Sequence, residues 1–168
     1  MFYPAPPKRI EPRVVLPALA ILAAIFLNQI SFDLFYLQMS MPLLAAGVIF
    51  YWGMYKPRLI PMWACFALGL VQDSFVGVPY GVHALGFILL RQLAVSQQRF
   101  LVGRSFDLVW VSYAMCLALW GVVEGFVMSV TGKPMDMWVV LRLVNTALIF
   151  PIAYTLMARL HHHWMQEV

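Results

Sequence analysis

The sequence has little charge for its length. Asp, Glu, Lys and Arg make up 11% of its 168 residues, whereas an average soluble domain carries about 25%. Hydrophobic residues reach 63%, and the mean hydropathy is +0.83. This shortage of charge excludes an ordinary soluble domain and favours a protein that is surrounded mainly by membrane lipid.

Cysteine is also scarce, and the sequence motifs of common enzymes are missing. Cys65 and Cys116 lie within separate apolar runs, where a thiol packs as a small hydrophobic group, and their spacing is not that of metal ligands. The sequence contains no G-x-S-x-G, no H-E-x-x-H and no phosphate-binding glycine loop. A hydrolase could be built from His83 as a base, or from Asp73 and Glu124 as an acidic pair within a few ångströms of each other. Without a supporting motif we expect no enzymatic activity, no metal and no cofactor.

What the sequence has in abundance is apolar runs. Because a helix of about 20 residues crosses a bilayer, the apolar residues are enough for five or six spans and leave little chain for a soluble domain. We predict an all-α polytopic membrane protein with six transmembrane helices. The six runs cover residues 14–28, 37–55, 59–75, 82–95, 106–130 and 137–157, and the fourth is the shortest. The predicted organisation is a Pro-rich arm (1–13), the six-helix domain (14–160) and a short tail (161–168).

The basic residues predict the orientation of these spans. With six spans and a cytoplasmic amino terminus, nine of the 11 Lys and Arg residues fall at or toward the cytoplasm. These nine are Lys8, Arg9, Arg13, Lys56, Arg58, Arg91, Arg99, Arg104 and Arg159. We therefore expect both termini in the cytoplasm. We expect no nucleic-acid partner, because that would need one continuous basic face.

A few ionisable side chains fall inside the predicted spans, where each costs a few kcal/mol on insertion scales. Glu124 and Arg142 lie about equally deep from the outer ends of the fifth and sixth runs, roughly 8–9 Å at 1.5 Å per residue. We predict that they pair, directly or through a polar neighbour such as Asn145. The pair is either purely structural or also contacts a partner or ligand. Arg91 lies near a cytoplasmic end, and its side chain is expected to reach the lipid headgroups.

Two local features allow two interpretations each. Asp73 precedes a Gly- and Pro-rich break between the third and fourth runs, where it either caps the turn or has a functional role. Gly121 and Gly125 form a G-x-x-x-G, which permits close approach of a helix of this chain or of a partner.

The segment around Asp73 carries a more specific pattern. Residues 69–85 read GLVQDSFVGVPYGVHAL, which has the form G-x-x-x-D-x-x-x-G-x-x-x-G-x-x-A-L. This segment resembles the signature of the bacterial rod shape-determining protein MreD family. Tyr51-Trp52 with Pro57 upstream, and Asn145 and Pro151 downstream, also resemble the family.

The resemblance implies a fold, a role and partners. The fold is expected to be similar to the six-helix substrate-binding components of energy-coupling-factor vitamin transporters. The role is that of a non-enzymatic scaffold subunit in the bacterial cytoplasmic (inner) membrane, where the rod complex, or elongasome, carries out lateral peptidoglycan synthesis and sets rod cell shape. MreC is the expected direct partner; the MreB filament, a glycosyltransferase and a transpeptidase are reached through the complex. The alternative is a small-molecule-binding membrane component of a transporter.

The candidate partner-binding or structural residues are Gly69, Asp73, Gly77, Gly81, His83, Glu124 and Arg142. Four of them are expected toward the outer half of the membrane, namely Asp73, His83, Glu124 and Arg142. Asp73 and the glycines are expected to shape the turn that docks or supports MreC.

Overall fold

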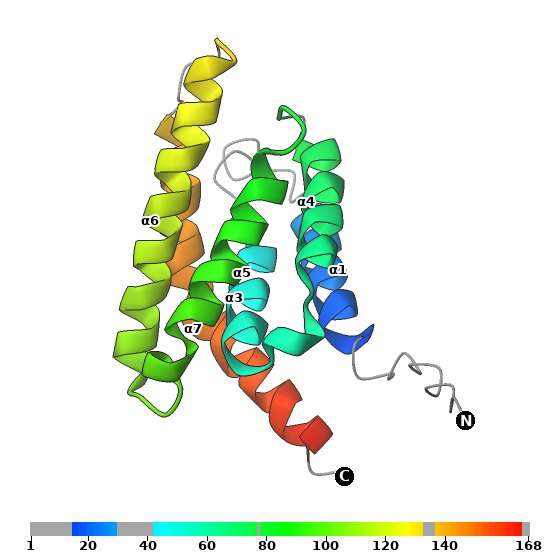
Figure 1. The fold of residues 1–168 in the computed structure, drawn as a ribbon, viewed down its shortest axis with the longest axis vertical. Helices are drawn as coiled ribbons and strands as arrows, with labels where there is room; N and C mark the ends of the chain where they lie inside the picture. Colours follow the sequence, from blue (N-terminus) through cyan, green and yellow to red (C-terminus); the bar gives the residue numbers. More distant parts are fainter. Residues whose placement is uncertain (1–14, 30–41, 77, 133–136, 166–168) are drawn as a thin grey trace, which may run out of the picture.

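A computed structural model of the chain describes residues 15–29, 42–76, 78–132 and 137–165 (Figure 1). Within these ranges the protein is helical, with a short 3₁₀ turn at Pro57–Leu59 and no strand. The helices are α1 (Val15–Gln29), α3 (Leu44–Tyr55), α4 (Met62–Val76), α5 (Val82–Leu101), α6 (Phe106–Val130) and α7 (Met137–Met165). The prediction of an all-α protein is confirmed for the described residues, and each helix coincides with one of the six apolar runs.

Two helices extend well beyond the sequence-based bounds, while α3 and α4 begin later than predicted, at Leu44 and Met62. We predicted a short fourth helix over 82–95, and this was wrong, because α5 continues to Leu101. The polar segment after residue 95 stays helical since it is amphipathic: Ala94 and Leu101 are buried, whereas Gln92 and Ser96 are exposed. Similarly, α7 runs beyond residue 157 and through the three histidines to Met165. The predicted arm (1–13) and the first part of the second run (37–41) lie outside the described residues.

The helix α3 is the centre of the bundle. Ten of its 12 residues are buried, which fits a helix that is apolar on all sides. It packs against α1, α5 and α7, while α4 packs on α5 and α1, and α6 packs on α5 and α7. The aromatic rings of Phe50, Tyr113 and Phe150 meet where α3, α6 and α7 join, with centroid separations of 4.0–5.8 Å.

Among the described residues, two helices are long and apolar enough to cross a bilayer, namely α6 and residues 137–159 of α7. Each carries an exposed apolar stripe about 28 Å long, from Val111 to Val130 on α6 and from Met137 to Leu156 on α7. That length matches the roughly 30 Å hydrocarbon core of a membrane. By contrast α1 and α4 have 15 residues and α3 has 12, so these three are about 18–23 Å long.

The proline within α7 is compensated from α6. Pro151 has no N–H, so the carbonyl of Ala147, four residues earlier, cannot receive its usual helical hydrogen bond. The indole Nε1–H of Trp110 donates to that carbonyl at 2.8 Å instead. The contact fixes α6 against α7 at a point that the sequence pattern does not reveal.

Candidate functional site

Asp73 caps the start of α5 from the neighbouring helix. The first N–H groups of a helix have no partner within it, and α5 begins directly after Gly81. The carboxylate of Asp73, near the end of α4, accepts the N–H of Gly81 at 2.7 Å and the N–H of His83 at 2.9 Å. A negative charge is stabilised at a helix N-terminus by the helix dipole. The capping interpretation of Asp73 is therefore confirmed.

The same carboxylate also holds the imidazole of His83. The Nδ1 of His83 lies 2.7 Å from Oδ1 of Asp73, and both side chains are fully buried. Because a carboxylate accepts hydrogen bonds, Nδ1 carries the proton and donates it. The three hydrogen bonds to Asp73 thus come from Gly81 and His83, and the Asp73 carboxylate fixes the shape of the α4–α5 turn.

The described signature glycines serve the same turn. At Gly69, an added Cβ would lie 2.3 Å from Cα of Ala84, so the backbones of α4 and α5 are in contact there. Gly81 has a φ of +105°, a left-handed conformation that other residues adopt only with strain. Gly77 lies outside the described residues. The close crossing of α4 and α5 at Gly69 and the turn at Gly81 both depend on residues that have no side chain.

Glu124 and Arg142 form the ion pair that their depths predicted. Arg142 Nη2 donates directly to Oε1 of Glu124, whose side chain is 1% exposed, against 12% for Arg142. One turn away, a Cβ added at Gly121 would lie 2.5 Å from Cδ1 of Leu143. At this glycine the G-x-x-x-G brings α6 against α7 of the same chain, as the intramolecular interpretation predicted.

These contacts decide which ionisable groups meet. The structure joins Asp73 to His83 and Glu124 to Arg142, so the carboxylates of Asp73 and Glu124 are engaged by different partners. The acidic pair that a hydrolase would need is not among the contacts of the described residues.

Arg91 bonds to the connection between α3 and α4. Its guanidinium donates from Nε to the carbonyl of Ile60 at 2.7 Å and from Nη2 to that of Pro57 at 3.2 Å, and its reach to the lipid headgroups stays a prediction. The connection between α3 and α4 contains two prolines, which cannot donate to carbonyls, so these carbonyls take a side-chain donor. The prolines before α4 were the signal that sequence reasoning missed.

The scan of protein-family models matches residues 8–160 to the model described as rod shape-determining protein MreD. The chain belongs to this family. The matched range includes the whole 69–85 segment, the Asp73–His83 hydrogen bond and the Glu124–Arg142 ion pair. Neither the search of the curated proteins nor that of the solved structures gave a match. The likeness to energy-coupling-factor components therefore stays a prediction.

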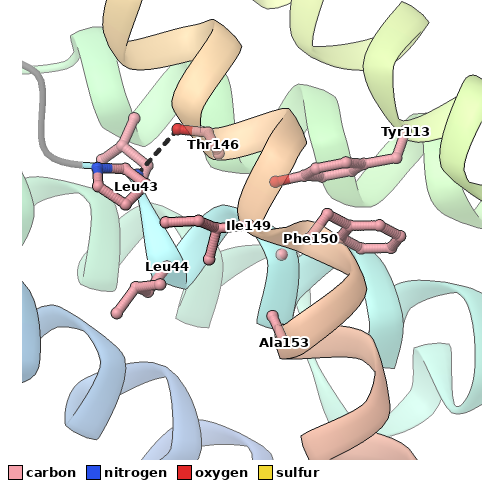
Figure 2. A pocket seen from close by; sticks show the side chains of 9 residues that line it. Leu43, Leu44, Tyr113, Thr146, Ile149, Phe150 and Ala153 are labelled. Carbon is pink, nitrogen blue, oxygen red and sulfur yellow. Dashed lines mark hydrogen bonds between the residues drawn. The ribbon is translucent and has the colours of Figure 1, made fainter.

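A small pocket of this MreD-family chain lies away from the signature turn, between α3, α6 and α7 (Figure 2). Its volume is ≈ 10 Å³, about the space of one water molecule. The hydroxyl of Tyr113 points into it, and Thr146 at its edge accepts the N–H of Leu43 at 2.9 Å (Figure 2). Sites for drug-sized ligands have volumes of about 300–1,000 Å³, so this pocket does not support the transporter-component alternative.

The capping bonds predict the effect of an Asp73→Asn change. The amide group would place N–H donors against the N–H of Gly81 or the donors of His83, which leaves at least one buried donor without an acceptor. We expect a loss of about 1–3 kcal/mol in the free energy of unfolding, measured by titrating the detergent-solubilised chain with a denaturing detergent. The matched control is Ser74→Ala, because the Ser74 hydroxyl is exposed and bonds only within its own helix. Equal losses for both variants would contradict the capping role.

Proposed function

We propose that this chain is an integral scaffold subunit of the bacterial rod complex. It spans the cytoplasmic (inner) membrane six times with both termini in the cytoplasm, and it binds MreC directly. Through that complex it connects with the MreB filament and with the glycosyltransferase and transpeptidase of lateral peptidoglycan synthesis. The family match over residues 8–160 supports the rod-shape role, and the apolar stripes of α6 and α7 support the membrane location.

The observation that carries a scaffold mechanism is the set of hydrogen bonds that Asp73 accepts. Both oxygens of Asp73 accept hydrogen bonds from Gly81 and His83 at the start of α5, which supports a structural role for this carboxylate in the turn. The signature of the family thus builds a rigid turn between two closely packed helices. We infer that the protein acts through the shape of this end of the bundle, which holds MreC, and not through chemistry.

The test is co-purification with MreC. From membranes of the source cell, the unsubstituted chain and the Ser74→Ala control are expected to retain MreC, since exposed Ser74 plays no part in the turn. Asp73→Ala removes the acceptors of the turn, and we expect it to lose most of the bound MreC per molecule of extracted chain. A size-exclusion profile would first establish that the variant is monodisperse. The proposal fails if the unsubstituted chain brings no MreC, or if Asp73→Ala brings it at normal yield.

A further inference from the structure

Three buried polar atoms lie at the α5–α6 interface without a hydrogen-bond partner among the described residues. They are Nε2 of His83, Nε1 of Trp120 and Oε2 of Glu124. All three residues are at most 1% exposed. Native proteins rarely leave buried polar atoms unpaired, so three together call for an explanation.

The packing of α5 on α6 brings the three side chains to one place. A Cβ added at Gly86 would lie 2.3 Å from Nε1 of Trp120, so the indole N–H rests on the backbone of α5. His83 is three residues before Gly86 and hence on the same face, with its ring centroid 5.8 Å from that of Trp120 and the planes at 88°. Glu124 follows Trp120 by four residues and shares its face of α6.

The chemistry of these atoms restricts what can bind to all three of them. Since Nδ1 of His83 donates to Asp73, Nε2 is an acceptor when the imidazole carries a single proton. Oε2 of Glu124 is a second acceptor, and the indole of Trp120 is a donor only. An ammonium ion has no lone pair for the indole, and an anion would be repelled by both acceptors. A water molecule can donate twice and accept from Trp120.

We propose that His83, Trp120 and Glu124 bind one ordered water molecule between α5 and α6. The water joins the Asp73–His83 pair to the Glu124–Arg142 pair, so that a single hydrogen-bonded network runs from α4 through α5 and α6 to α7. The signature turn is thereby linked to α7, with which it shares no direct polar contact among the described residues. This site is independent of any partner protein.

The test is magic-angle-spinning NMR of the full chain, labelled with ¹⁵N-histidine and reconstituted in phosphatidylethanolamine–phosphatidylglycerol bilayers. We expect Nδ1 of His83 to be protonated, and Nε2 to be unprotonated and to correlate with water protons. His83→Asn assigns the signals, because it removes them and leaves those of the three terminal histidines. The proposal is overturned if Nε2 is protonated, if it shows no correlation with water, or if it correlates with the indole proton directly.

Two tryptophan variants separate this site from general loosening of the bundle. Trp120→Phe deletes the donor and is expected to weaken or abolish the water correlation of His83. Trp110→Phe removes the other interhelical indole bond of α6, at Ala147, and is expected to leave the correlation unchanged. An unchanged correlation in Trp120→Phe also overturns the three-membered site. If Trp120→Phe does not fold, the unsubstituted spectrum still decides, since a buried nitrogen contacts water only where water is bound.

Discussion

Gly69→Ala is expected to cost about 3 kcal/mol or more in the free energy of unfolding. The new Cβ would lie 2.3 Å from Cα and 2.6 Å from N of Ala84. Backbone atoms cannot rotate away as a side chain can, so α4 and α5 must move apart along their whole contact. The separation would also lengthen the bonds from Asp73 to Gly81 and His83, which start only a few residues away.

Gly47→Ala is the matched control for this prediction. The added Cβ in α3 would meet its nearest neighbours, in Ala153 and Phe150, at 3.5 Å, which is ordinary van der Waals contact. Alanine also has the higher helix propensity, by about 1 kcal/mol, so this variant should be neutral or slightly more stable. Both are measured by titrating the solubilised chain with a denaturing detergent. Equal stability of the two variants would show that α4 and α5 are not packed as closely as the structure has them.

Arg142→Met is the second change with a large expected effect, about 3–5 kcal/mol of destabilisation. It removes the counter-ion of Glu124, whose side chain is 1% exposed, and leaves a buried carboxylate without a cation. Losing one member of a buried ion pair costs more than losing both, because the remaining charge stays buried without its counter-ion. The same unfolding titration measures the loss.

Two further variants show whether the loss comes from the stranded charge. Arg99→Met changes an exposed arginine at the end of α5 and should alter stability by less than about 0.5 kcal/mol. The double variant Glu124→Gln with Arg142→Met removes both charges and should recover most of the stability. A double variant no more stable than Arg142→Met alone would mean that the cost lies in the packing of the Arg142 side chain and not in the charge of Glu124.

Some tertiary contacts could be predicted because they follow from distance along a helix. Counting residues inward from the ends of two consecutive apolar runs puts Glu124 and Arg142 at the same depth, and antiparallel helices then bring them together. The turn role of Asp73 was also open to prediction, since turn-forming residues follow it closely. In both cases the interacting groups lie within about 20 positions of each other.

Other contacts depend on how distant segments pack, and no local pattern predicts them. Trp110 completes the hydrogen bonding around Pro151, 41 positions away, and Arg91 bonds to carbonyls more than 30 positions earlier. The donor side chains of Trp110 and Arg91 could be found in the sequence, but the acceptors are backbone carbonyls, which every residue has. Only the path of the chain selects which carbonyl is reached.

The sequence by itself determined that the protein is helical and which segments form its helices. Apolar runs and scarce charge favour a helical bundle in lipid, because backbone groups there must bond within their own helix. The tertiary structure decided what the few polar groups do. It showed that the Asp73 carboxylate faces inward onto α5, and it brought His83, Trp120 and Glu124 to one interface. The reason is that a buried polar group is stable only beside a partner, and packing alone chooses that partner.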